Sequence, residues 1–204
     1  MKLSLIKEKI GKLIVFQLQD LYFADPSFRQ GTLYDWVKQG QVIRLKKNCY
    51  IFSDFKVWGY DLYLLSNRIY QPSYISLELA LSHYGVIPES VHLITAVSTL
   101  KTQKFVNTCG TFQYNTIAKD LFFGYHNLPH RERTVQIATI EKTILDYLYL
   151  NSPISNLDDF IGLRWNQQIL NEIINWNKLK SYLVIYNNEA LRNRVSILKK
   201  YLEE

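Results

Sequence analysis

The sequence has little cysteine and no long apolar run. Its 204 residues include two cysteines, Cys49 and Cys109, which show no metal-type spacing. A reduced protein with two incidental thiols is the simplest interpretation. Nowhere do about eighteen uncharged apolar residues follow one another, which excludes a membrane-spanning helix.

Signals for export and for catalysis are also missing. Residues 1–16, MKLSLIKEKIGKLIVF, interrupt their apolar side chains with lysines and a glutamate, so they lack the continuous apolar core of a signal peptide. No phosphate-binding glycine loop, nucleotidyltransferase glycine-serine signature or nucleophile elbow occurs. We therefore expect a cytoplasmic protein that has no catalytic residues, binds no metal or cofactor and contacts no membrane.

Positive charge is present, and it is concentrated at the amino-terminal end. The net charge is +6, and residues 1–52 alone carry nine Lys or Arg against four Asp or Glu, which gives +5. The remaining residues are nearly neutral, and a hydrophobic content of 48% describes an ordinary globular chain. Concentrated positive charge favours a polyanion through counterion release, whereas a solvated lysine face would give the same count.

The amino-terminal 54 residues predict three helices. Apolar residues recur at helical spacing from Leu3 to Leu13, and a second helix is expected at about 17–23. Pro26 ends this helix, because proline cannot continue a helical hydrogen-bond ladder. Ser27 followed by Gln30 matches a capping box, so a third helix is expected to start there.

A basic hairpin follows the third helix. Residues 42–45 and 49–52 are short apolar runs typical of strands, and KKN at 46–48 is the turn between them. Helix, turn, helix and hairpin is the order of a winged helix-turn-helix, in which one helix enters the major groove and the hairpin wing reaches phosphate. We therefore predict that residues 1–54 bind double-stranded DNA. A protein-interaction module with a solvated basic surface is the alternative.

The candidate DNA-binding residues lie on the helix over 28–39 and on the hairpin. Arg29 and Gln30 fall in the first helical turn, where arginine can contact guanine and glutamine can contact adenine. Asp35 argues slightly against binding, because a carboxylate repels phosphate, although a carboxylate can instead accept a hydrogen bond from the amine of cytosine. Lys46 and Lys47 are expected at the tip of the wing. The predicted set is Ser27, Arg29, Gln30, Thr32, Tyr34, Lys38, Arg44, Lys46, Lys47 and Asn48.

Residues 55–150 predict a mixed α/β domain, and residues 151–204 predict a helical extension packed on it. Helices are expected at about 58–69, at 76–84 and from 139 onward, and the tail reads as helical from 156. Strands are expected at 91–97, 104–106, 111–114 and 135–138. The expected fold class is therefore α+β, with an amino-terminal winged helix-turn-helix, a mixed α/β domain and a helical carboxy-terminal tail.

An enzyme-like interpretation of the second domain depends on few residues. His126 and His130 are four residues apart, as in some metal sites, but a proline between them opposes a regular helix, so we expect polar loop residues. Glu141, Lys142 and Asp146 resemble a nuclease cluster, yet a salt-bridged, solvated helix surface explains the last two. A winged-helix-targeted nuclease-like or metal-dependent enzyme stays the alternative function.

Several stretches follow one another in a characteristic order. They are YQPSYISLELALSHYGVIPE (70–89), ITAVSTLKTQKF (94–105), GTFQY (110–114), LFFGY (121–125) and ATIEKTILDYLYL (138–150). Together they resemble the AbiEi-type antitoxin and abortive-infection regulator family. TLYDWVKQGQVIRLKKNCYIF (32–52) is similar to the winged-helix half of that family. The family's wing often has a glycine where Asn48 stands, and asparagine also tolerates the left-handed conformation that a hairpin turn requires.

The resemblance implies an antitoxin of a type IV toxin–antitoxin system. Such a protein represses its own operon by binding operator DNA through the first domain, alone or as a homodimer. It counteracts a cognate AbiEii-type nucleotidyltransferase toxin through the second domain, either in a direct complex or through the toxin's substrate or product. The tail after Asn151 matches no block, and no residue in contact with the toxin is identified.

Tyrosines are abundant in the family-like blocks. Tyrosine suits interfaces because it joins apolar area to a polar tip. For any single tyrosine, however, filling the core is the slightly better explanation, since only a few residues dominate a typical interface. The seven tyrosines concerned are Tyr70, Tyr74, Tyr84, Tyr114, Tyr125, Tyr147 and Tyr149.

Overall fold

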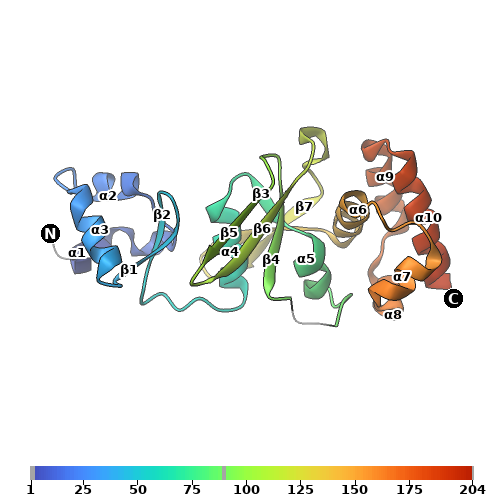
Figure 1. The fold of residues 1–204 in the computed structure, drawn as a ribbon, viewed down its shortest axis with the longest axis horizontal. Helices are drawn as coiled ribbons and strands as arrows, with labels where there is room; N and C mark the ends of the chain where they lie inside the picture. Colours follow the sequence, from blue (N-terminus) through green and yellow to red (C-terminus); the bar gives the residue numbers. More distant parts are fainter. Residues whose placement is uncertain (1–2, 89–90, 204) are drawn as a thin grey trace.

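The protein has a mixed α+β fold, as expected. The structure is a computed structural model that describes residues 3–88 and 91–203. In these residues the chain forms ten α-helices and eight strands in two sheets. Figure 1 shows three groups of elements along the long axis, with helices and a hairpin at the amino-terminal end, a sheet in the middle and helices at the carboxy-terminal end.

The amino-terminal group contains the three predicted helices and the predicted hairpin. Its elements are α1 (Leu3–Ile10), a short 3-10 helix (Gly11–Leu13), α2 (Leu18–Ala24), α3 (Gln30–Lys38), β1 (Val42–Lys46) and β2 (Cys49–Phe52). Ile6, Leu21 and Leu33 are buried and pack in one cluster of the amino-terminal group. Phe16 adds an antiparallel bridge to Tyr50, which ties the segment before α2 to the hairpin.

The capping-box prediction for α3 is wrong. The helix begins at Gln30, and Arg29 is its N-cap residue, with extended backbone dihedrals. The Ser27 hydroxyl instead donates to Asp25 Oδ1 at 2.7 Å, so it belongs to the turn before the helix. Asp25 binds the serine in place of the α3 backbone, because it lies two residues before Ser27 and accepts from both the hydroxyl and the backbone N–H of Ser27.

The central group is a six-stranded sheet with the order β5-β6-β4-β3-β8-β7. The strands are β3 (Ser73–Ile75), β4 (Leu93–Ser98), β5 (Gln103–Asn107), β6 (Gly110–Thr116), β7 (Tyr125–His130) and β8 (Arg133–Ala138). β3 pairs with β8, and β4 pairs with β6, in parallel, whereas the other neighbours are antiparallel. The four predicted strands are present, and β3 and β7 are additional.

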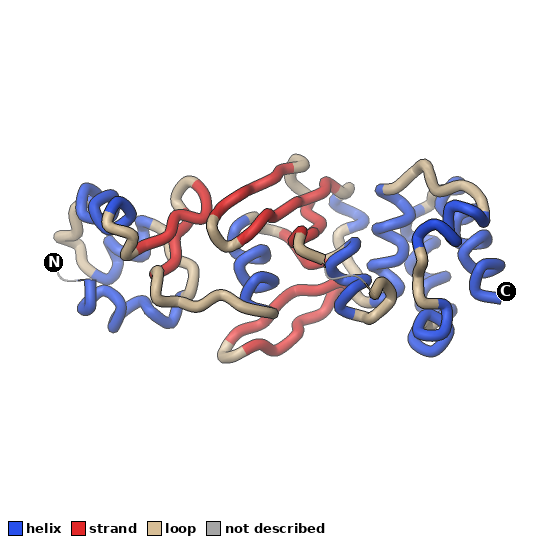
Figure 2. Tube along the Cα trace, turned by 60° about the horizontal axis from the view of Figure 1, so that its bottom comes forward, coloured by secondary structure: helices blue, strands red, loops and turns tan. Residues whose placement is uncertain are grey.

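Helices cover both faces of this sheet. The elements are α4 (Tyr60–Ile69), α5 (Leu77–His83), a 3-10 helix (Lys119–Leu121) and α6 (Ile140–Leu150). Alternation along β3 sends Tyr74 into the cluster around α6 and Ile75 into the cluster around α4. Figure 2 shows the strands between two groups of helices, with the chain termini at opposite ends.

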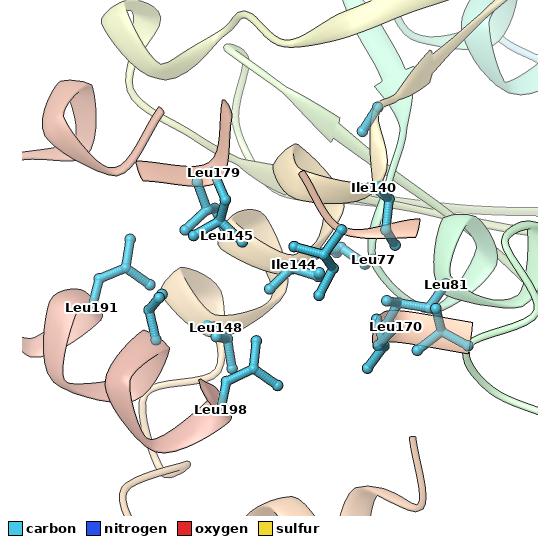
Figure 3. Packing of buried hydrophobic residues seen from close by; sticks show 14 of the residues in the cluster. Leu77, Leu81, Ile140, Ile144, Leu145, Leu148, Leu170, Leu179, Leu191 and Leu198 are labelled. Carbon is cyan, nitrogen blue, oxygen red and sulfur yellow. The ribbon is translucent and has the colours of Figure 1, made fainter. Parts of the chain in front are cut away.

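The carboxy-terminal residues are helical, as predicted. They form α7 (Leu157–Leu163), α8 (Gln167–Ile173), α9 (Trp176–Tyr186) and α10 (Glu189–Glu203). Asn156 caps α7 by accepting from the Asp159 amide at 3.0 Å. Figure 3 shows leucines of α5, α8, α9 and α10 gathered around α6. Among the described residues, no helix is both long and apolar enough to cross a membrane.

Candidate nucleic-acid interface

A groove of about 580 Å³ lies between α2, α3 and the hairpin. It brings together five of the ten predicted DNA-binding residues, which are Gln30, Tyr34, Arg44, Lys47 and Asn48. Among the lining residues that the structure describes, none is acidic. The arrangement therefore offers amide, phenol and cationic groups on one concave surface.

The α3 side of the groove is built from a pair one helical turn apart. Gln30 and Tyr34 are i, i+4 neighbours, and the Gln30 amide donates to the Tyr34 hydroxyl at 2.8 Å. Tyr34 keeps 54% of its surface exposed. The hydrogen bond orients the side chain of Gln30, which is exposed to solvent.

The hairpin turn consists of Lys47 and Asn48. Asn48 has a φ of +57°, which confirms the left-handed conformation expected for it. Its Oδ1 accepts from the Leu18 amide at 3.0 Å, so the same side chain satisfies one of the free N–H groups at the start of α2. This bond fixes the turn against α2 and leaves Lys47 as the exposed cation of the tip.

Lys46 does not lie at an exposed tip, and that expectation is wrong. Its Nζ lies 5.7 Å from the ring centroid of Tyr70 and 5.6 Å from that of Phe105, both in the central domain. A register shift between Arg44 and Lys46 interrupts the regular pairing of the hairpin. Such a bulge re-aims a side chain, and here the lysine points toward the sheet. Arg44 stays exposed and donates from Nε to the Lys46 carbonyl at 3.3 Å.

The remaining predicted residues lie outside the groove. Ser27, Arg29 and Thr32 line a second hollow at the start of α3, together with Asp25. Hydrogen bonds from the Ser27 side chain and backbone lower the pKa of Asp25, so this hollow contains a carboxylate. Lys38 is exposed at the last residue of α3.

Four lining residues of the groove were absent from the predicted set, namely Leu18, Gln19, Tyr22 and Tyr50. Gln19 and Tyr22 line the α2 side of the groove. Their i, i+3 spacing places both on one helical face, and this periodicity is a signal that the sequence contains. The spacing alone does not identify Gln19 and Tyr22 as groove residues, because no feature of the neighbouring sequence indicates that this face of α2 turns toward the hairpin.

His126 and His130 lie in the edge strand β7, so the prediction that they are loop residues is wrong. His130 Nε2 lies 2.7 Å from Asp61 Oδ1, and Arg131 donates to Asp61 Oδ2 at 2.9 Å. Glu141 pairs separately with Lys178 at 3.0 Å. In residues 3–88 and 91–203, no three His, Cys, Asp or Glu side chains are grouped so that they could hold a metal ion.

Lys142 and Asp146 are fully buried, so the prediction of a solvated surface pair is wrong. Asp146 accepts from Lys142 Nζ, from the Tyr186 hydroxyl at 2.6 Å and from the Tyr74 hydroxyl at 3.0 Å. Burial lowers the pKa of Lys142, and the Asp146 charge opposes that shift. The Ser76 hydroxyl adds a further donor to Asp146 at 2.9 Å. The network joins α6 to β3 and α9.

The seven tyrosines of the family-like blocks belong mainly to the core. Tyr74 and Tyr114 are fully buried. The other five are partly buried and pack against the two clusters of the central and carboxy-terminal parts. The structure therefore accounts for these side chains through packing within the chain.

Comparison with protein-family models and with curated proteins gives no match for this chain.

Proposed function

We propose that this protein is an operator-binding antitoxin. Its amino-terminal part acts as a winged helix-turn-helix that binds double-stranded DNA, and the remainder counteracts a cognate nucleotidyltransferase toxin in the cytoplasm. The observation that carries the DNA-binding part is the groove, in which α3 and the hairpin present Gln30, Arg44 and Lys47 together. The antitoxin part is supported by the resemblance of residues 1–150 to the AbiEi-type family.

The division of roles follows from the chemistry of the groove. Gln30 at the start of α3 has the amide group that reads adenine in the major groove. Arg44 and Lys47 supply charge for the phosphates, and phosphate contacts provide affinity without sequence preference. Asp35, exposed on α3, repels phosphate and therefore restricts which part of the helix approaches the backbone. Lys46 contributes to DNA binding only indirectly, by holding the hairpin on the central domain, because its ammonium group lies over two rings of that domain.

The first test measures binding of the full chain to its own upstream DNA and to scrambled DNA across a salt series. We expect preference for the upstream DNA. The variant Arg44→Ala/Lys47→Ala should make the negative slope of log affinity against log salt shallower by about two, since each phosphate contact contributes about −0.9 to it. The matched control is Lys180→Ala/Lys200→Ala, which removes two exposed positive charges from α9 and α10. Equal binding of both DNAs, with equal slopes for the two variants, contradicts the proposal.

The antitoxin part needs a separate test. Full-length protein is co-expressed with the toxin encoded beside it, and growth is compared with that of cells expressing the toxin alone. We expect growth to be restored by the wild-type chain and also by Arg44→Ala/Lys47→Ala, which loses repression of the operon. Restoration of growth by neither protein refutes the antitoxin role while leaving the DNA-binding result intact.

A further inference from the structure

The sheet opens between β3 and β8 near their amino-terminal ends. These parallel strands pair at Ile75 and Ile137. Closer to the start of β3, the Asn67 side chain from α4 stands between the two strands. Its Nδ2 donates to the backbone carbonyls of Ser73 and Gln136, each at 3.3 Å. Its Oδ1 accepts from the backbone N–H of Gln136 at 2.7 Å. Asn67 thus replaces the ladder bonds of the diverging strands.

A polar pocket of about 340 Å³ lies outside this opening. Its lining includes Arg68, Gln71, Ser73, Thr134 and Gln136, all of which carry hydrogen-bond donors in their side chains. None of the lining residues that the structure describes is acidic. The pocket therefore favours a ligand that accepts hydrogen bonds and carries negative charge.

Ser73 is the strongest indication that a ligand belongs there. The residue is 1% exposed, and its Oγ has no hydrogen-bond partner among the described residues. Ser73 lies two residues before Ile75, so alternation places its side chain on the α4 side of the sheet, where the pocket lies. A buried hydroxyl without a partner is destabilising, and a ligand acceptor would remove that cost.

Arg68 supplies the charge. Its side chain is exposed at the pocket, and within residues 3–88 and 91–203 it makes no ion pair. Guanidinium groups bind phosphate through two parallel hydrogen bonds, which makes arginine well suited to this anion. The Asn67 network accounts for the divergence of the strands, but it uses neither the Ser73 hydroxyl nor the Arg68 guanidinium.

We propose that this pocket binds a small phosphate-bearing molecule, with Arg68 and Ser73 on the phosphate. Since one water molecule occupies about 30 Å³, the volume exceeds that of a lone phosphate and admits an organic part up to the size of a mononucleotide. The side-chain amides of Gln71 and Gln136 are the groups available to that organic part. The site is separate from the groove on the amino-terminal domain and does not depend on the function proposed above.

Isothermal titration of the full chain with four probes tests the proposal. The probes are inorganic phosphate, ribose 5-phosphate, adenosine monophosphate and adenosine, which lacks phosphate. We expect saturable binding of the phosphate-bearing probes and none of adenosine. Tighter binding of the two organic phosphates identifies the organic part as a determinant, whereas equal binding of inorganic phosphate identifies the free anion as the ligand. Absence of binding by all phosphate-bearing probes overturns the proposal.

Variants locate the binding. Arg68→Gln should weaken phosphate binding at least tenfold, and Ser73→Ala several-fold, while Arg164→Gln, an exposed arginine between α7 and α8, should have no effect. Ser73→Ala should also raise the melting temperature without ligand, because it removes the unpartnered hydroxyl. Arg44→Ala/Lys47→Ala must retain the binding, which distinguishes this pocket from the groove. Equal weakening by Arg164→Gln and Arg68→Gln refutes the assignment.

Discussion

At the scale of single residues, Asn48 combines two structural tasks. It holds the left-handed turn position and caps the start of α2. Asn48→Ala removes the hydrogen bond and places a side chain that disfavours a φ of +57°, so we expect the free energy of unfolding to fall by about 2 kcal/mol. Glycine adopts a positive φ without strain, so Asn48→Gly loses only the hydrogen bond, and the free energy of unfolding should fall by about 1 kcal/mol. Denaturant unfolding checks both values, and equal losses in the two variants contradict the backbone contribution.

The buried pair of Lys142 and Asp146 gives a second prediction at this scale. Asp146→Asn leaves the lysine charge buried without a counter-charge, so we expect the free energy of unfolding to fall by about 3–5 kcal/mol. Lys142→Met/Asp146→Asn removes that charge as well and should lose less than Asp146→Asn alone. A double-mutant cycle in denaturant measures this coupling. Additive losses would mean that the two side chains do not interact energetically.

His83 gives a prediction about pH. Burial and the neighbouring His126 lower its pKa below the usual 6.5, and its Nδ1 lies 3.2 Å from the Tyr60 hydroxyl. Below pH 6.5 the His83 side chain therefore binds more protons in the unfolded chain than in the folded one. Its contribution to stability is complete above pH 6.5 and is lost as the pH falls from 6.5 through the lower pKa of the folded state. His83→Gln should lose less stability than wild type between about pH 7.5 and 5. Equal losses in wild type, His83→Gln and the exposed control His92→Gln contradict this assignment.

These residues also show what local sequence cannot determine. An i, i+4 Lys and Asp pair has the same spacing on a solvated helix and on a buried one. What decides between them is Tyr186, forty residues beyond Asp146, together with Tyr74 on β3. By contrast, the conformation of Asn48 was predictable, because a two-residue hairpin turn itself requires a positive φ.

At the scale of elements, the hairpin was predicted in position but not in environment. Val42, Tyr50 and Phe52 pack on the amino-terminal helices. Leu45 and Ile51, with Cys49, pack on the central domain instead. A strand that is buried on both faces has a continuous apolar sequence, such as CYIF in β2. A short edge strand can have the same sequence pattern. The sequence pattern therefore could not reveal that the hairpin is covered on its second face.

Lys46 and Lys47 permit a test of this arrangement. Lys46→Ala removes a cation held over two rings, so we expect the free energy of unfolding to fall by about 1 kcal/mol. Lys47→Ala should change stability by less than about 0.5 kcal/mol, because its side chain is exposed. Chemical denaturation of the two variants measures the difference. If Lys47→Ala is the more destabilising of the two, the contact of Lys46 with the rings does not contribute to the free energy of unfolding.

The missed strand β7 has a physical explanation. Pro129 opposes a regular helix that would present both His126 and His130, and the same proline hides the strand. However, β7 lies at the edge of the sheet, where a proline can be accommodated without removing a bond to a further strand. The other additional strand, β3, has three residues, all of them buried, which is too short for alternation to be visible.

At the scale of the whole molecule, the cores are shared across the expected domain boundaries at 54 and 150. Leu45 and Ile51 lie in one cluster with Leu64 and Phe112 of the central domain. The Asn107 side chain also donates to the Leu45 carbonyl at 3.2 Å. On the other side, Leu145 and Leu148 of α6 lie in one cluster with residues of α8 to α10. Helix and strand patterns, together with the extent of the family-like blocks, predict three segments, but shared burial across their borders depends on contacts distant in sequence.

This sharing predicts one cooperative unfolding transition, because unfolding of either end would expose apolar residues of the middle. Calorimetry of the full chain should show a single peak. Leu21→Ala, in the amino-terminal cluster, and Leu198→Ala, in the carboxy-terminal cluster, should each shift that whole peak downward, since each removes a fully buried side chain worth about 2–5 kcal/mol. Two peaks, of which Leu21→Ala moves one and Leu198→Ala the other, would show that the ends unfold independently. In that case the contacts of the hairpin with the sheet would orient the groove between α2, α3 and the hairpin without stabilising it.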